Sequence, residues 1–172
     1  MIIDIDRLPV KGLEITKDFE FFNSELVEEE AVFLEPVHTE IIIRRAGDEI
    51  LLKGKISTTM SFICCRCLSP FEYDIDSTFD MVYLPEELEE EKEQLETEDL
   101  HKSFYYNGRI DLRRIILEQL NLTFPTRPLC TQDCPGLCPV CGKKIREGKC
   151  SCDLSKKDSR LEKLKIFLKD NR

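Results

Sequence analysis

Eight of the nine cysteines in this 172-residue chain fall into four close pairs. Such pairs suit a tetrahedral thiolate metal site, because two sulfurs a few residues apart can bind one ion from a single tight turn. Two pairs complete one closed four-thiolate site, so four pairs predict two structural zinc ions. The predicted ligands are Cys64, Cys67, Cys130, Cys134, Cys138, Cys141, Cys150 and Cys152.

A disulfide framework and a redox centre are the alternatives to metal. The first residues, Met1 to Asp6, contain neither the positive segment nor the long apolar run of an export signal. We therefore expect a reducing cytoplasm, where paired cysteines are metal ligands or redox centres. A thioredoxin-like motif would open a helix in a βαβ unit, whereas Cys64 and Cys67 interrupt a β-patterned region. Metal is the favoured interpretation.

The most specific cysteine motif is Cys138-Pro139-Val140-Cys141-Gly142. A glycine after the second cysteine tolerates a left-handed conformation, which turns backbone N–H groups toward the sulfurs and offsets their charge. Cys150 and Cys152 follow after eight residues, enough for a small loop to fold back. One local site built from Cys138, Cys141, Cys150 and Cys152 is the economical assignment.

The remaining pairs are far apart in the sequence. Cys64 and Cys67 lie at a bend between two β-patterned runs, and their nearest candidates are Cys130 and Cys134. A site built from these four would tie the sheet to the tail. Cys65 is left over and is expected to be a free thiol, with replacement of Cys64 as a ligand as the alternative.

The formal net charge of −9 hides two halves of opposite sign. Residues 1–99 carry 26 acidic and 9 basic side chains, whereas residues 100–172 carry 8 acidic and 16 basic ones. The acidic total therefore says little against a polyanionic partner, because the field that matters is local. With 41% hydrophobic residues and no apolar run of bilayer length, a membrane protein is not expected.

Period-2 alternation of apolar and polar residues predicts strands over 37–43, 52–64 and 71–83. Short connections between them predict an antiparallel meander. Asp111 is a candidate N-cap for a helix whose apolar stripe packs on the sheet. The predicted fold class is α+β: an antiparallel meander with one or two packed helices and a Cys-rich, zinc-stapled C-terminal segment.

Composition divides the chain into four parts. We expect a β-rich domain over 1–84, an acidic linker over 85–99, a helix packing on the sheet within 100–129, and a Cys-rich zinc-binding tail with a terminal helix over 130–172. The linker carries nine acidic residues and one lysine, Lys92, which is typical of a solvated segment. The alternative is an electrostatic mimic of nucleic acid that covers a basic surface.

Basic residues are concentrated around and after the last cysteines. Zinc knuckles that display lysine and arginine are used to bind RNA phosphates, and a merely solvated helix face is the alternative. No Gly-rich phosphate loop or nucleophile elbow is present, so we expect no enzyme and no small-molecule substrate. The predicted RNA contacts are Lys143, Lys144, Arg146, Lys149, Lys156, Lys157 and Arg160.

The stretches 64–73, 129–142 and 158–161 together resemble the YceD family, the large ribosomal RNA subunit accumulation proteins. The resemblance implies a bacterial cytoplasmic protein without catalytic activity that supports large-subunit ribosomal RNA accumulation, through ribosomal RNA or a ribosomal protein. Two positions depart from the family pattern: Lys143 to Arg146 replace a usual Asn-Leu-Asn, and Ser159 replaces a usual proline. The competing function is a zinc-stabilised protein–protein adaptor without direct RNA contact.

Overall fold

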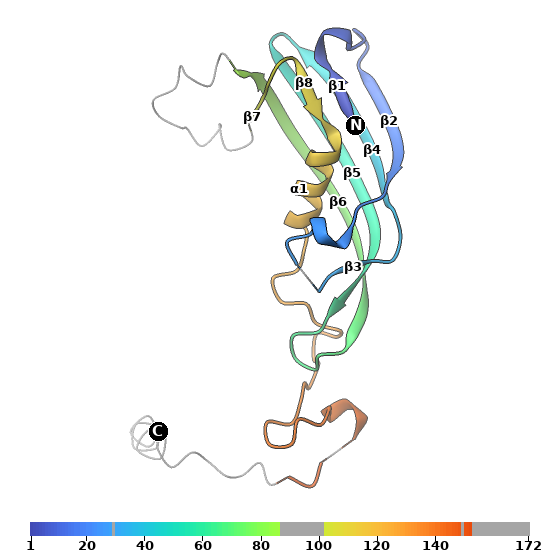
Figure 1. Cartoon of the computed structure of the whole chain (residues 1–172), viewed down its shortest axis with the longest axis vertical. Coiled ribbons are helices and arrows are strands. Elements are labelled where there is room, and N and C mark those ends of the chain that lie inside the picture. Colours follow the sequence, from blue (N-terminus) through green and yellow to red (C-terminus); the bar gives the residue numbers. More distant parts are fainter. Residues whose placement is uncertain (29, 87–101, 149, 153–172) are drawn as a thin grey trace, which may run out of the picture.

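The computed structural model describes residues 1–28, 30–86, 102–148 and 150–152. Within these residues the main element is a six-stranded sheet in the order β2-β4-β5-β6-β7, with β3 paired to β5 off this path (Figure 1). Every pairing is antiparallel except that of β6 with β7, which is parallel. The strands are β2 (Leu13–Phe19), β3 (Val32–Phe33), β4 (Val37–Ala46), β5 (Glu49–Ile63), β6 (Pro70–Pro85) and β7 (Lys102–Tyr105).

One face of this sheet forms the hydrophobic core. Strand residues alternate between the faces, so β4 and β5 each bury every second side chain. Each fully buried Ile, Leu or Phe contributes about 1.5–3 kcal/mol of hydrophobic free energy. The largest fully buried side chains of these two strands include Ile41, Ile43, Ile50, Leu52, Ile56, Met60 and Phe62.

The helix α1 (Leu112–Leu122) covers the core face of the sheet (Figure 1). Its N-cap is Asp111, whose Oδ1 accepts a hydrogen bond of 3.1 Å from the backbone N–H of Arg113. A separate two-stranded ribbon, β1 (Ile2–Asp4) with β8 (Arg109–Asp111), leads directly into the helix. The helix residues that pack into the core are Leu112, Ile115, Ile116 and Leu120.

Arg113 joins the helix to the connection between β2 and β3. Its Nη2 lies 2.8 Å from Oε2 of Glu25, and its Nη1 donates to the Glu20 carbonyl oxygen at 2.7 Å. The guanidinium also lies 4.4 Å from the centre of the Phe21 ring. Only the planar guanidinium can satisfy a carboxylate, a carbonyl and a ring face together, so this residue fixes how the connection lies on α1.

After α1 the chain continues to the far end of the sheet, where β5 turns into β6 (Figure 1). The described residues beyond 123 form turns, with one isolated bridge between Leu137 and Lys144 and a 3-10 turn at Ile145–Glu147. Two further 3-10 turns, Ile5–Arg7 and Asn23–Glu25, lie in the connections before and after β2. This placement brings the Cys-rich segment against the bend that carries Cys64 and Cys67.

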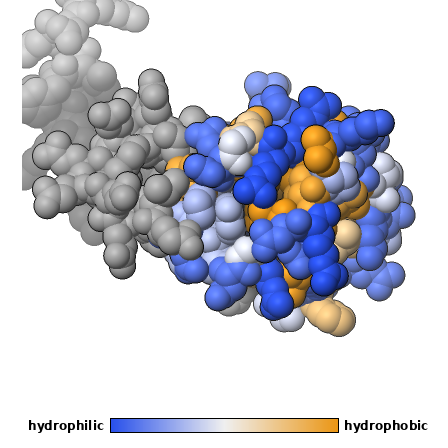
Figure 2. Space-filling view, turned by 90° about the horizontal axis from the view of Figure 1, so that it is seen from above, coloured by the Kyte–Doolittle hydropathy of each residue, from blue (hydrophilic) through white to orange (hydrophobic). Residues whose placement is uncertain are grey.

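The surface seen from above is mostly hydrophilic, with apolar side chains in a narrower stripe between polar ones (Figure 2). No helix among the described residues is both long enough and apolar enough to span a bilayer.

The predicted α+β class is confirmed. The three-strand meander exists as β4, β5 and β6, and the predicted N-cap Asp111 begins α1. Outside this meander, β7 joins β6 in parallel over Val82 to Pro85, so the complete sheet is mixed. Most of the expected acidic linker and all of the expected terminal helix lie outside the described residues.

Candidate metal centres

The first group of cysteines joins two distant parts of the chain. Cys64 and Cys67 lie in the turn between β5 and β6, and Cys130 and Cys134 lie in the segment after α1. Their four Sγ atoms lie within 4.8 Å of one another. Cys64, Cys67 and Cys134 are buried, so the sulfurs converge in the interior at the end of the sheet.

The sulfur separations in this first centre fit metal ligands and not disulfides. Sγ of Cys64 lies 3.8 Å from Sγ of Cys134, and Sγ of Cys67 lies 3.7 Å from Sγ of Cys130. Four sulfurs at about 2.3 Å from one zinc ion stand about 3.8 Å apart in a tetrahedron, whereas a disulfide bond measures about 2.05 Å. All nine cysteines are free thiols.

The second centre is local and more exposed. Cys138, Cys141, Cys150 and Cys152 bring their Sγ atoms within 4.8 Å of one another. Cys138 is buried, Cys141 is exposed, and the other two are half-buried. The structure therefore places the eight predicted ligands in the two groups of four that the spacing indicates. Cys65 is exposed and belongs to neither group.

The two centres each contain a turn of the same construction. In the first turn, Leu68 N–H donates to the Cys64 carbonyl and Cys64 N–H donates to the Ser69 carbonyl, both at 2.9 Å. In the second turn, the N–H of Gly142 donates to the Cys138 carbonyl at 2.9 Å, and the N–H of Cys138 donates to the Lys143 carbonyl at 2.8 Å. The residue after the second cysteine has positive φ in both turns, 55° at Leu68 and 72° at Gly142.

Backbone N–H groups inside these turns favour thiolates. Burial opposes ionisation of Cys64, but N–H groups of Cys130, Cys67 and Arg66 donate to its sulfur and lower its pKa to about 6. N–H groups of Cys141 and the preceding residue similarly lower the pKa of Cys138 to about 6. These donors offset negative charge on sulfur, as expected of residues that surround a thiolate metal ligand.

Each centre also contains one thiol that resists ionisation. Burial, together with the neighbouring sulfurs, raises the pKa of Cys134 to about 12. The contact with Cys141, together with burial, raises the pKa of Cys152 to about 12. Four thiolates this close repel one another, so full ionisation requires a cation among them. A four-sulfur donor set suits zinc or an iron–sulfur cluster, and the residues therefore fit a bound metal.

Several contacts hold the first centre together around Arg66. The N–H of Cys65 donates to the Pro128 carbonyl at 2.9 Å, and Nη1 of Arg66 donates to the Cys134 carbonyl at 3.0 Å. Gly136 has a φ of 74°, and a Cβ there would lie 3.0 Å from the Arg66 carbonyl oxygen. Arg66 thus ties the two chain segments together through a backbone carbonyl.

The predicted RNA contacts are only partly described. Lys143 and Arg146 are exposed. Nζ of Lys144 lies 3.9 Å from Oε1 of Glu147. Nη1 of Arg146 lies 3.8 Å from Sγ of Cys130, so this side chain reaches from the second centre to the first. Lys149, Lys156, Lys157 and Arg160 lie outside the described residues.

A family model described as "Large ribosomal RNA subunit accumulation protein YceD" matches residues 52–168. The chain belongs to the YceD family. The matched region runs from β5 through both cysteine groups, so the family pattern includes the predicted ligands. The name of the family refers to accumulation of large-subunit ribosomal RNA.

The relatives are distant and longer. The chain is 24% identical to an uncharacterised protein of Mycobacterium leprae over 64% of this chain and 49% of that protein. It is 28% identical to an uncharacterised protein of Mycobacterium tuberculosis over 60% of this chain and 48% of that protein. It is 23% identical to an Arabidopsis thaliana protein named large ribosomal RNA subunit accumulation protein YCED homolog 1, chloroplastic, over 88% of this chain and 52% of that protein. The chain thus spans about half the length of these relatives. No solved structure matches it.

Proposed function

We propose that this protein is a non-catalytic biogenesis factor that supports accumulation of large-subunit ribosomal RNA by binding that RNA in the bacterial cytoplasm. The observation that carries the proposal is the family match over residues 52–168, which spans β5, α1 and both cysteine groups. The name of the Arabidopsis relative supports the same role.

We infer that both centres hold structural zinc. Four protein thiolates fill a tetrahedral zinc site and leave no open position for a substrate, which supports a structural and not a catalytic role. Elemental analysis of protein purified without added metal should give about two zinc ions per chain. Iron in place of zinc would refute the metal identity, and a metal-free protein with intact disulfides would refute both centres.

The second centre offers the basic residues for RNA. Lys143 and Lys144 lie between the ligands Cys141 and Cys150, so metal binding fixes the loop that carries them. Binding through phosphates releases counterions, and the affinity then falls steeply with salt. Each lost phosphate contact should reduce the log–log salt slope by about 0.7 for single-stranded RNA.

A matched pair of variants tests the RNA contact. The double variant Lys143→Gln and Lys144→Gln should weaken RNA binding and flatten the salt slope while leaving the metal content unchanged. The control, Lys53→Gln and Lys55→Gln, removes equal charge from β5, where these lysines pair with Asp80 and Asp76. In cells, deletion of the gene should lower the ratio of large- to small-subunit ribosomal RNA. An unchanged ratio would refute the proposed function.

A protein–protein adaptor is the competing function, and one surface favours it. Strand β6 carries exposed carboxylates along the side of the sheet opposite the core, which would suit a basic protein partner. The adaptor would lead if the protein and both double variants bind RNA no more tightly than a protein without affinity for RNA, while the cellular amount of large-subunit ribosomal RNA still depends on the gene. The carboxylates are Glu72, Asp74, Asp76 and Asp80.

A further inference from the structure

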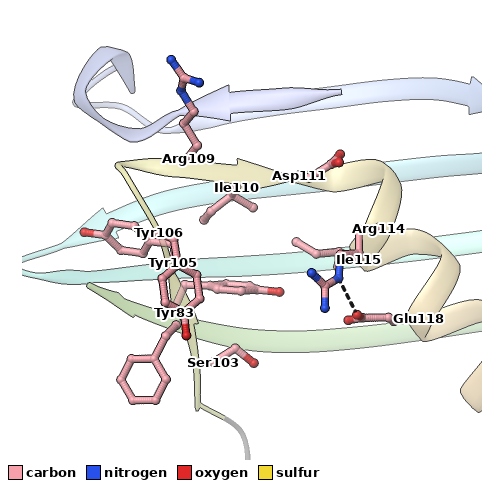
Figure 3. A pocket seen from close by; sticks show the side chains of 11 residues that line it. Tyr83, Ser103, Tyr105, Tyr106, Arg109, Ile110, Asp111, Arg114, Ile115 and Glu118 are labelled. Carbon is pink, nitrogen blue, oxygen red and sulfur yellow. Dashed lines mark hydrogen bonds and ion pairs between the residues drawn. The ribbon is translucent and has the colours of Figure 1, made fainter. Parts of the chain in front are cut away.

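A cavity of about 290 Å³ lies between β6, β7, β8 and the first turns of α1 (Figure 3). It is at the opposite end of the sheet from the cysteine groups (Figure 1). Aromatic rings make up one side of it, contributed by Tyr83 of β6, Phe104 and Tyr105 of β7, and Tyr106 of the turn that follows. Three of the four tyrosines of the chain line this one cavity.

The side of the cavity that α1 forms is partly polar. Arg114 and Glu118 of α1 face the rings and form an ion pair, with Nε of Arg114 3.0 Å from Oε1 of Glu118 (Figure 3). Ser103 of β7 adds a hydroxyl beside the rings, and Ile110 and Ile115 add apolar surface (Figure 3). Asp111 also lies at the cavity, but its Oδ1 accepts hydrogen bonds from the N-terminal amino group and from the Arg113 N–H. The cavity therefore combines flat apolar surfaces with hydrogen-bond acceptors and donors, and it is open to solvent because the Arg114 side chain is 80% exposed.

The dimensions and chemistry limit what can bind there. Pockets for drug-sized ligands measure about 300–1,000 Å³, so this cavity suits a single small ring system. A purely aliphatic ligand would make no hydrogen bond to the ion pair or to the hydroxyl that line the cavity. A planar heterocycle can stack on tyrosine and also present polar edges to the opposite side. Bases in duplex RNA stay stacked and paired, so the matching ligand is an unpaired base.

We propose that this cavity binds one base of single-stranded RNA and prefers a base with an exocyclic amino group. The proposal rests on the proposed RNA-binding function and adds a site and a specificity to it. Carboxylates accept hydrogen bonds from the amino group of cytosine. Glu118 is the acceptor here, because only its Oε1 is paired with Arg114. Uracil has no amino group, and a carbonyl oxygen at the same position would face the Glu118 carboxylate without a proton between them.

Short homopolymeric RNAs test the proposal with purified, metal-loaded protein. Six-nucleotide oligomers of cytidine and adenosine should bind more tightly than the oligomer of uridine, measured by fluorescence anisotropy. Loss of one stacked base typically lowers affinity about 5- to 150-fold, so Tyr106→Ala should weaken cytidine binding by a factor in that range and Tyr106→Phe should retain it. Glu118→Gln keeps an acceptor and adds a donor, so it should reduce the preference over uridine.

Tyr73→Ala is the matched control, because Tyr73 is an exposed tyrosine of β6 that does not line the cavity. Thermal unfolding and metal content should match the unaltered protein in every variant used. Equal binding of the uridine and cytidine oligomers, or equal losses in Tyr106→Ala and Tyr73→Ala, would overturn the site. Because these measurements use purified protein, they can fail while deletion of the gene still lowers large-subunit ribosomal RNA. They can also succeed when deletion has no effect.

Discussion

The turn glycine of the second centre should control metal affinity through its backbone conformation alone. Gly142 has a φ of 72°, and a Cβ added there would meet no atom within 4 Å. A left-handed conformation costs an ordinary residue about 1–2 kcal/mol, and the lower freedom of the unfolded chain returns about 0.4–1 kcal/mol. The variant Gly142→Ala should therefore lose about 1 kcal/mol, with no steric clash to complicate the result.

This loss should be visible as weaker metal binding. A metal site of this kind exists only in the folded turn, so strain in the turn is subtracted from the binding free energy. A penalty of about 1 kcal/mol corresponds to about fivefold weaker binding at one of two sites. Competition with a chelator, followed by a two-site fit, measures it.

Two other positions serve as controls. Gly47 has a φ of 67° and equally open surroundings, but it lies in the turn between β4 and β5. Gly47→Ala should lower the free energy of unfolding by a similar amount and leave both metal affinities unchanged. Leu68, with a φ of 55°, already carries the strain at the first centre, so Leu68→Gly should not weaken metal binding there. Equal effects of Gly142→Ala and Gly47→Ala on metal affinity would refute the reasoning.

Three further changes test the fold and the order of metal loss. Gly54→Ala should destabilise the sheet by about 1–3 kcal/mol in thermal unfolding, because the added Cβ would lie 2.3 Å from Cζ of Phe79. Adding Phe79→Leu to the same chain should recover part of the loss. Arg113→Lys should cost about 1–3 kcal/mol although the charge is kept, because the ammonium cannot replace the forked contacts; a loss below about 0.5 kcal/mol would contradict this. A chelator should remove the second metal before the first, because Cys141 is exposed whereas Cys64 and Cys134 are buried; simultaneous release would contradict the difference in burial.

The elements that could be predicted from the sequence are those with a strong local signal. β5 alternates over its whole length, and α1 has both an N-cap at Asp111 and a helical apolar stripe. β2 was not predicted, because it is an edge strand in which only Phe19 is buried and Lys17 interrupts the apolar positions. β7 has only four residues, too few for a clear alternation. Its parallel pairing with β6 is a contact between separate parts of the chain, which the local pattern does not indicate.

The candidate sites follow the same division. The second centre could be grouped from local spacing, whereas the first was grouped by elimination, because Cys64 and Cys134 are 70 residues apart. The contact of Arg146 with Cys130, which joins the two centres, has no sequence signal. The aromatic cavity draws on β6, β7, β8 and α1, so only the run of three aromatic residues at 104–106 hinted at it.

The difference between the two centres predicts that they contribute differently to RNA binding. The first centre joins the β5–β6 turn to the segment after α1, so its metal supports the sheet domain as well as the tail. The second spans only Cys138 to Cys152 and carries Lys143 and Lys144 between its ligands. Cys138→Ser should therefore remove one metal and weaken RNA binding while the main unfolding transition stays unchanged.

Serine at Cys67 provides the contrast. Cys67→Ser should also remove one metal, but it should lower the temperature of the main unfolding transition, because Cys67 is buried beside Phe71 at the end of the sheet. Metal analysis, thermal unfolding and RNA binding on the two variants separate the roles. If Cys138→Ser destabilised the sheet as much as Cys67→Ser, the second centre would be part of the domain core and not a support for a basic loop.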